Sequence, residues 1–237
     1  MDTNLPVFDD HDDLDESALT YAIGDVHGHL DKIRALIDRC KKHCGARQIR
    51  FVFIGDYFDR GPDSRRVVEF LIDLQRSMPG DAICLRGNHE AAVLACAQGA
   101  DQAHWLLNGG RQTLMSYGIE DVREFPRSHL EWAGSLPVSY DDGRRLFVHA
   151  GVNPALPLSA QRLDDLLMIR EPFLSHDGDY GRLIVHGHTP TWSREPELYR
   201  NRINVDTGAG YGGPLTAAVF SQTRTSPIAF LIGAVCS

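Results

Sequence analysis

The sequence has no apolar run that approaches the roughly 20 residues needed to span a membrane. Its first residues also lack the order of basic and then apolar residues that marks a signal peptide. We therefore expect a cytoplasmic protein without a membrane partner. Hydrophobic residues make up 43% and charged residues 24% of the 237-residue chain, which is ordinary for a globular protein and argues against a fibrous or disordered class.

Cysteine is scarce and odd in number, because the chain has five cysteines without the regular spacing of a disulfide framework. We expect these thiols to be reduced. Cys40 and Cys44 lie one helical turn apart and could form half of a metal site. No matching pair of Cys or His follows them, so packing in the core is the favoured interpretation.

Lys and Arg are absent from residues 2–16, which carry seven acidic residues and therefore most of the net charge of −8. The rest of the chain keeps 25 of the 32 acidic residues against 24 basic ones and is nearly neutral. We predict that residues 1–18 form an acidic tail without fixed structure and that residues 19–237 form one domain. Such a tail repels polyanions, so a nucleic-acid partner is not expected.

Short apolar segments predict the β-strands of the domain. They are residues 19–23, 48–54, 82–85, 145–148, 182–185, 202–205, 215–220 and 228–232. The first three alternate with helical patterns, which predicts parallel βαβ units. The later strands follow one another closely, which predicts antiparallel pairing and a second sheet.

Two helical patterns separate these first strands. One runs from Leu30 to Cys44, and the other follows Gly61, where Asp63 or Ser64 could cap the helix. Residues 91–137 are predicted to be mostly helical, with a break at Asn-Gly-Gly, 108–110.

Five of the predicted strands end in the same way, with Asp, Asn or His beside glycine. The junctions read GDVHG (24–28), GDYFDRG (55–61), RGNHE (86–90), HAG (149–151) and HGHT (186–189). In open α/β sheets, ligands bind where the carboxyl ends of the strands meet. Carboxylates, one amide and imidazoles, without thiolate, suit Mn, Fe or Zn in a reactive site. Each motif alone also fits a turn or a helix cap, but five together favour a metal site.

Taken together, these motifs resemble the signature of the calcineurin-like metallophosphoesterases, and specifically the bacterial serine/threonine protein phosphatases of the phosphoprotein phosphatase family. The resemblance extends from about Tyr21 to Gly213. It implies an α/β fold, namely a four-layer α/β/β/α sandwich with two mixed β-sheets, and two divalent metal ions, with Mn favoured and Fe or Zn as alternatives. The metal ligands implied by similarity are Asp25 and His27 on the first metal, Asp56 as the bridge, and Asn88, His149 and His188 on the second.

The same resemblance implies direct attack on phosphorus by a hydroxide that bridges the metals, without a phosphoenzyme. His89 would protonate the leaving group, and Asp59 would form a hydrogen bond with this histidine. Arg60 and Arg170 would bind the phosphate oxygens. Arg86 is ambiguous, and its favoured role is a structural ion pair with a buried carboxylate.

Two segments depart from the animal members of the family. His186 stands where those members have no ligand, and we expect His188 rather than His186 to bind metal. The segment NVDTGAGYGGPLTA (204–217) is similar instead to a loop of bacterial phosphatases and diadenosine tetraphosphate hydrolases, in which Tyr211 could line the pocket.

The leading interpretation is a phosphomonoesterase acting on phosphoserine or phosphothreonine, with phosphotyrosine as a further candidate. The alternative is hydrolysis of a nucleoside polyphosphate, such as diadenosine tetraphosphate or a polyphosphate cap on RNA. Glu90 in LRGNHE favours the first class, whereas WLLNGG (105–110) and TGAGYGG (207–213) leave the second open. A phosphate-binding scaffold without catalysis is disfavoured, because all six predicted ligands and His89 are present. The expected partner is thus a phosphoprotein or a phosphorylated small molecule.

Overall fold

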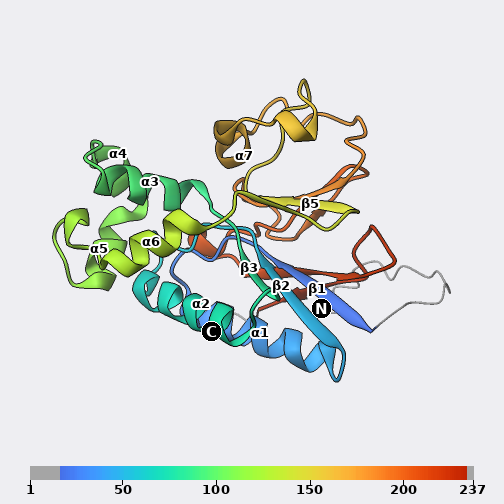
Figure 1. The fold of residues 1–237 in the computed structure, drawn as a ribbon, viewed down its shortest axis with the longest axis horizontal. Helices are drawn as coiled ribbons and strands as arrows, with labels where there is room; N and C mark the ends of the chain where they lie inside the picture. Colours follow the sequence, from blue (N-terminus) through green and yellow to red (C-terminus); the bar gives the residue numbers. More distant parts are fainter. Residues whose placement is uncertain (1–16, 234–237) are drawn as a thin grey trace.

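The computed structural model describes residues 17–233, so the acidic residues 2–16 of the predicted tail lie outside the described residues. Within this range the strands form two sheets that stack face to face (Figure 1). The first sheet has the order β10 (Ala229–Ile232), β9 (Thr216–Ser221), β1 (Ala18–Ile23), β2 (Gln48–Phe53) and β3 (Ala82–Cys84). The second sheet has the order β4 (Ser139–Asp141), β5 (Arg145–Val148), β6 (Leu183–His186), β8 (Arg202–Asn204) and β7 (Glu197–Leu198).

The α-helices are α1 (Leu30–Cys44), α2 (Ser64–Ser77), α3 (Asn88–Ala97), α4 (Ala103–Trp105), α5 (Arg111–Tyr117), α6 (Arg127–Ser135) and α7 (Leu163–Met168). A π-helical turn at Leu106–Gly110 joins α4 to α5, and short 3₁₀ turns lie at Val122–Glu124, Leu158–Ala160 and Ala209–Tyr211. Helices α1 and α2 cover the outer face of the first sheet, and α7 lies over the second (Figure 1). The predicted α/β/β/α sandwich with two mixed sheets is confirmed.

Strand β1 shows how alternation builds the layers, because successive side chains of a strand point to opposite faces. Tyr21 and Ile23 pack into the core beneath α1 and α2. Ala22, between them, faces the second sheet and joins Phe147 and Phe220 in the core between the sheets. Both faces of β1 are therefore buried, which explains why its sequence is apolar without interruption.

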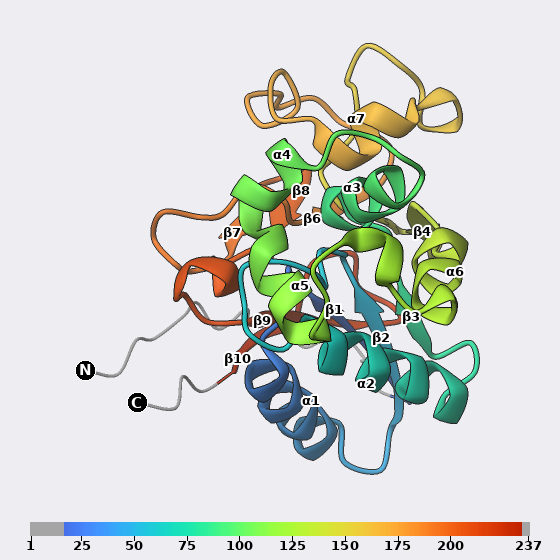
Figure 2. The same cartoon turned by 90° about the vertical axis from the view of Figure 1, so that its left-hand side faces the viewer.

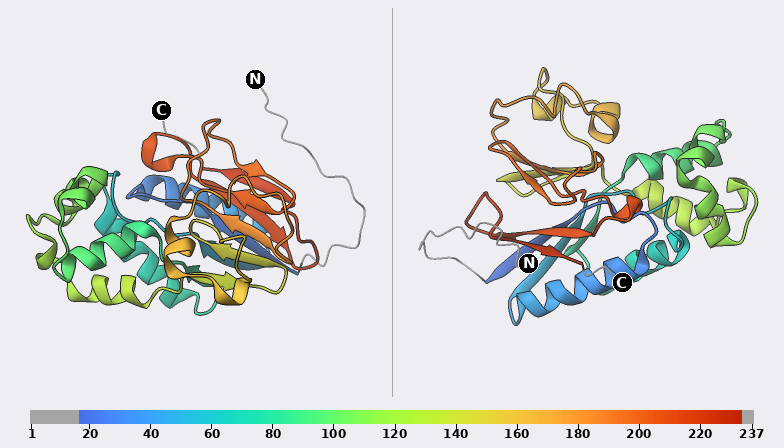
Figure 3. Two further views of the ribbon diagram at one scale, coloured as in Figure 1. Left: turned by 90° about the horizontal axis from the view of Figure 1, so that it is seen from above. Right: turned by 180° about the vertical axis from the view of Figure 1, so that it is seen from behind.

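Parallel pairing of the strands brings the loops that carry the sequence motifs to one edge of the sheets. Strands β1, β2 and β3 run parallel to one another, and so do β5, β6 and β8. Helices α3 to α6 lie together to one side of both sheets (Figures 2 and 3). The loops after five of these six strands carry the motifs found in the sequence, so the fold brings those motifs to a common edge.

All eight predicted strands are present, and the expected antiparallel pairs and second sheet are confirmed. Strands β4 and β7 were not predicted, because they are short, partly exposed edge strands without apolar alternation. The helical region after β3 is confirmed, and its chain kinks at Gly109, where φ is 114°. Asp63 occupies the N-cap position of α2, but its side chain forms no cap hydrogen bond and lies 3.4 Å from the Arg66 guanidinium.

Four of the five cysteines lie within residues 17–233, and all four are buried free thiols. Cys40 and Cys44 pack in the core beneath the first sheet, which confirms the packing interpretation. Between residues 17 and 233, no helix combines the length and the apolar character needed to cross a membrane.

Candidate metal centre and active site

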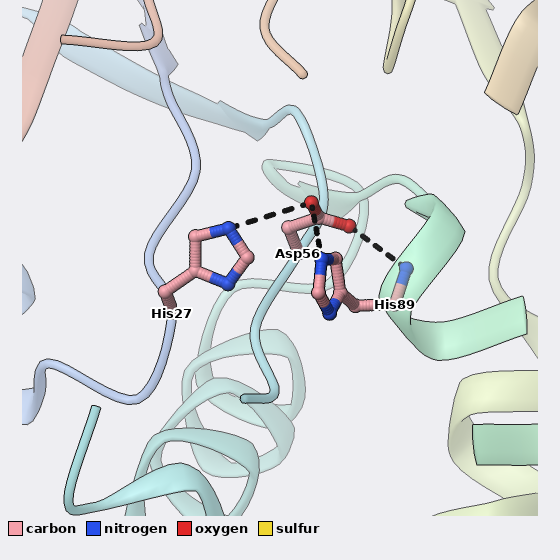
Figure 4. A group of neighbouring side chains, drawn as sticks. All are labelled: His27, Asp56 and His89. Atoms are coloured by element: carbon pink, nitrogen blue, oxygen red, sulfur yellow. Dashed lines mark hydrogen bonds and ion pairs between the residues drawn. The ribbon is translucent and has the colours of Figure 1, made fainter. Parts of the chain in front are cut away.

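Asp56 is the residue around which the candidate centre is arranged. It follows β2 and lies at 2% exposure with φ at 54°, a conformation that the tight strand-end loop imposes. Its carboxylate belongs to two groups of potential metal donors, one with His27 and His89 and one with His149 and His188. Figure 4 shows the imidazoles of His27 and His89 on either side of this carboxylate. A carboxylate with two oxygens is suited to bridging two cations.

Two of the histidines around Asp56, His27 and His149, are held in one tautomer by backbone carbonyls. Nδ1 of His27 lies 2.9 Å from the Phe58 carbonyl, and Nδ1 of His149 lies 3.1 Å from the Ile54 carbonyl. A carbonyl only accepts, so each Nδ1 carries the hydrogen and each Nε2 keeps its lone pair. The two Nε2 atoms face the Asp56 carboxylate at 3.5 Å and 3.4 Å. Burial lowers the pKa of both imidazoles, which favours the neutral form that binds metal.

Asn88 adds an amide oxygen to this set of lone pairs. Its Oδ1 lies 2.8 Å from His149 Nε2 and 2.8 Å from His188 Nδ1. Because the hydrogen of His149 is on Nδ1, its Nε2 and the Asn88 oxygen are two acceptors that face each other without a hydrogen between them. Such convergence is unfavourable alone and favourable around a cation, so these residues fit a metal ion.

The buried carboxylates near Asp56 also indicate a cation site. Asp25 accepts a hydrogen bond from the His188 backbone N–H at 3.1 Å. Burial, followed by the negative charges of Asp206 and Asp56, raises the pKa of Asp25 well above its ordinary value. Burial also raises the pKa of Asp206 to about 6. Three carboxylates are costly to bury together unless a cation neutralises them.

Asp206 was missed by the sequence reasoning. It follows β8, two residues before Gly208, and accepts the Gly208 backbone N–H at 3.0 Å. The signal that could have found it is the one used for the other motifs, namely an Asp close to Gly after a buried strand.

The His89 imidazole is paired with Asp59, as the sequence predicted for a proton donor and its carboxylate partner. Nδ1 of His89 lies 2.6 Å from Asp59 Oδ2. Asp59 is fully buried and also accepts hydrogen bonds from Trp105 Nε1 at 3.0 Å and from Thr113 Oγ1 at 2.6 Å. Burial lowers the pKa of His89, but the charges of Asp56 and Asp59 outweigh it and raise this pKa overall. Trp105 and Thr113 were not singled out from the sequence.

Glu90 ties two strand-end loops together. It is fully buried, and its carboxylate accepts the backbone N–H groups of Asp56 at 2.9 Å, Tyr57 at 2.8 Å and Gly87 at 2.8 Å. Gly87 has to be glycine at this approach, because a Cβ there would lie 2.2 Å from Asp56 Oδ1. The loop after β2 is therefore locked against the loop after β3.

A cleft of about 550 Å³ opens over the centre and is lined by Arg60, Arg170 and Tyr211 among others. The Arg60 guanidinium contacts His27 Nε2, lies 3.0 Å from His89 Nε2 and packs over the Tyr211 ring at 4.5 Å. Both predicted phosphate-binding arginines thus line the space in front of the centre.

The two remaining residues considered in the sequence lie elsewhere. His186 is buried on the other face of its strand against Phe173, with ring centroids 4.9 Å apart, while His188 lies with the cluster around Asp56. Arg86 contacts the Gly134 carbonyl of α6. The expected carboxylate partner of Arg86 is wrong, since none is found within residues 17–233.

A family model described as calcineurin-like phosphoesterase matches residues 19–214. The chain belongs to this family. It is therefore a metal-dependent phosphoesterase with the dinuclear metal centre of that family.

Two relatives of this calcineurin-like phosphoesterase are named for different activities. The chain is 27% identical to the bis(5'-nucleosyl)-tetraphosphatase PrpE [asymmetrical] of Anoxybacillus flavithermus, over 86% of this chain and 91% of the relative. It is 28% identical to serine/threonine-protein phosphatase 1 of Salmonella typhimurium, over 84% of this chain and 90% of the relative. A solved cold-active protein-tyrosine phosphatase of a Shewanella species has the same fold, with a TM-score of 0.60 and 19% identity, over 91% of this chain and 80% of that one.

The role of Glu90 in this phosphoesterase can be tested by Glu90→Gln, which keeps the shape but turns an NH₂ group towards backbone N–H donors. Burial, followed by the charge of Asp56, raises the pKa of Glu90 to about 7 against the opposing N–H donors, so the carboxylate dominates at pH 8. We expect a loss of about 2–4 kcal/mol in the free energy of unfolding, measured by urea denaturation of metal-free protein at pH 8.

The matched control is Glu69→Gln on α2, where a half-exposed carboxylate pairs with Arg65 at 2.9 Å. Its expected loss is about 0.5 kcal/mol or less. Equal losses for the two variants would contradict the locking role of Glu90.

Proposed function

We propose that the chain hydrolyses phosphate esters or anhydrides by direct attack of water at two divalent metal ions, with His89 as the general acid. The observation that carries this proposal is the convergence of neutral imidazole nitrogens on the Asp56 carboxylate, directly beside the His89–Asp59 pair. The Asn88 amide oxygen lies 2.8 Å from two of these nitrogens.

The residues proposed to hold the metals are Asp25 and His27 for one ion, Asp56 for both, and Asn88, His149 and His188 for the other. When bound, the two cations supply the positive charge that activates water near neutral pH and stabilises the phosphoryl oxygens. The donor set of oxygen and imidazole without thiolate favours Mn, with Fe and Zn as alternatives.

The chain's own groups then handle the proton and the phosphate. Asp59 accepts from Nδ1 of His89, so the proton to be transferred is on Nε2, which faces the cleft. Arg60 and Arg170 orient the phosphate oxygens. The water oxygen forms a bond to phosphorus, the P–O bond to the leaving group breaks, and the leaving oxygen takes the His89 proton.

Two substrate classes fit this chemistry. Phosphoserine and phosphothreonine are favoured by the His89–Asp59 pair, because an alkoxide leaving group needs a proton. Nucleoside polyphosphates are favoured by an arginine- and aromatic-lined cavity next to the cleft. The named activities of the two relatives support both classes.

The dependence on metal is tested by chelation. EDTA treatment should abolish hydrolysis of p-nitrophenyl phosphate and leave the circular dichroism spectrum largely unchanged, because a core of this size does not need a metal to form. Addition of Mn should restore turnover. Full activity after verified removal of metal would refute the proposed mechanism.

The bridging role is tested by Asp56→Asn, which keeps the size but removes the charge and one anionic oxygen. We expect the purified variant to lose at least one of two metals, counted by mass spectrometry of the metal content. Asp38→Asn makes the same change on the exposed face of α1 and should keep both. Two tightly bound metals in the Asp56 variant would exclude it as the bridge.

The general acid is tested by His89→Asn on two leaving groups. Hydrolysis of a phosphoserine peptide should fall roughly 10²–10⁴-fold, whereas p-nitrophenyl phosphate should lose distinctly less, because p-nitrophenolate leaves without a proton. Asp59→Asn should show the same dependence in weaker form, since it acts through His89. Equal losses on both substrates, with metal content unchanged, would mean that His89 positions the phosphate instead.

A further inference from the structure

A second cavity of about 680 Å³ adjoins the catalytic cleft. The two spaces share Arg170, Pro190 and Tyr211 as lining residues. The second cavity extends along the segment after β6, where it is lined by Thr191, Trp192 and Arg194. Its volume lies within the range of about 300–1,000 Å³ that is typical of small-molecule sites. A substrate whose phosphate lies in the cleft could therefore extend into this cavity.

The aromatic side chains that line this cavity are exposed rather than buried. The Trp192 side chain is fully exposed and Tyr211 is 61% exposed, although large aromatic side chains usually find packing partners. Tyr211 is held by the Arg60 guanidinium on its face and by its loop, whose Ala209 and Gly213 carbonyls accept hydrogen bonds from Lys32. Exposed aromatic faces of this kind are platforms on which nucleobases stack.

The polar groups of the cavity lack partners in the protein. Throughout residues 17–233, no hydrogen bond or ion pair engages the guanidinium groups of Arg170 or Arg194. The hydroxyls of Thr189 and Thr191 are buried without a hydrogen-bond partner in the same described range, and Thr191 is only 5% exposed. The two guanidinium groups are exposed and can therefore pair with an anionic ligand, whereas the two hydroxyl oxygens are buried and out of reach of a ligand.

We propose that this cavity binds the nucleoside of a nucleoside polyphosphate, with the base stacked on Trp192 and the phosphate chain running past Arg194 and Arg170 to the metal centre. The proposal rests on the proposed function and names its substrate class. A phosphate monoester carries charge only at the centre, where Arg60 and Arg170 lie, whereas a polyphosphate carries charge along its length and could also reach the Arg194 guanidinium.

The reaction on such a substrate is balanced with water alone. The water gives up one proton to solvent and its oxygen bonds to one phosphorus, the bridging P–O bond to the next phosphorus breaks, and the departing phosphate keeps the electron pair. It leaves as the anion or takes the proton of His89. No oxidant, reductant or further group is needed.

The test compares diadenosine tetraphosphate with p-nitrophenyl phosphate, which has no nucleoside, for the Mn-loaded wild type and for Trp192→Ala and Arg194→Gln. For each variant, the ratio of kcat/KM on the dinucleotide to kcat/KM on p-nitrophenyl phosphate should fall about 10- to 100-fold through KM. Trp192→Phe should retain most of the ratio. Met115→Ala removes an 80% exposed side chain from α5, away from both cavities, and should leave the ratio unchanged.

A second measurement uses metal-free protein, so that it does not depend on catalysis. Titration with AMP should quench tryptophan fluorescence saturably, and Trp192→Phe should remove the saturable part. An unchanged ratio in Trp192→Ala and Arg194→Gln, with no quenching by AMP, would overturn the subsite. So would an equal rise in KM for a phosphoserine peptide, because the cavity would then bind peptide. A wild type inactive on p-nitrophenyl phosphate would instead refute the proposed function.

Discussion

The buried carboxylate of Glu90 is the interaction on which the candidate centre depends. By accepting four backbone N–H groups from the loops after β2 and β3, it fixes the position of Asp56 relative to Asn88 and His89. These loops have little regular structure, and Asp56 itself has a positive φ. A cluster of ligands on such loops keeps its geometry only if the supporting hydrogen bonds over-determine it. Glu90 supplies that constraint from the first turn of α3.

The centre is also shaped by the cost of burying charge. Asp25, Asp56 and Asp206 are all at 3% exposure or less. Burial lowers the pKa of His27 and His149, which favours the neutral imidazole, and their carbonyl partners fix the tautomer. Neutral imidazoles do not neutralise the negative charge of three carboxylates. The arrangement therefore becomes favourable when cations enter, which couples the electrostatics of the fold to metal binding.

Much of the fold and of the candidate centre could be predicted from the sequence, because residues that directly follow a buried strand are placed by that strand. This holds for the four motifs that contain Asp25, Asp56, His149 and His188. The partners of Asp59 could not be found in this way, since Trp105 and Thr113 lie 46 and 54 residues from it and reach it only through the packing of α4 and α5. Strands β4 and β7 were missed for a similar reason, since their pairing partners and not their own side chains make them strands.

The residues that the sequence predicts are those proposed to carry out the reaction, whereas the outer segments proposed to select the substrate were harder to predict. The proposed metal donors and the His89–Asp59 pair lie at the bases of loops, close to the sheets, and most of them are buried. The segment with Trp192 and Arg194, and the glycine-rich loop with Tyr211, extend outward from the same strand ends and expose their side chains. These outer segments can change without disturbing the buried ligands, because the hydrogen bonds that fix Asp56 come from Glu90 on the inner side. Relatives of one fold with a common centre can therefore have different substrates.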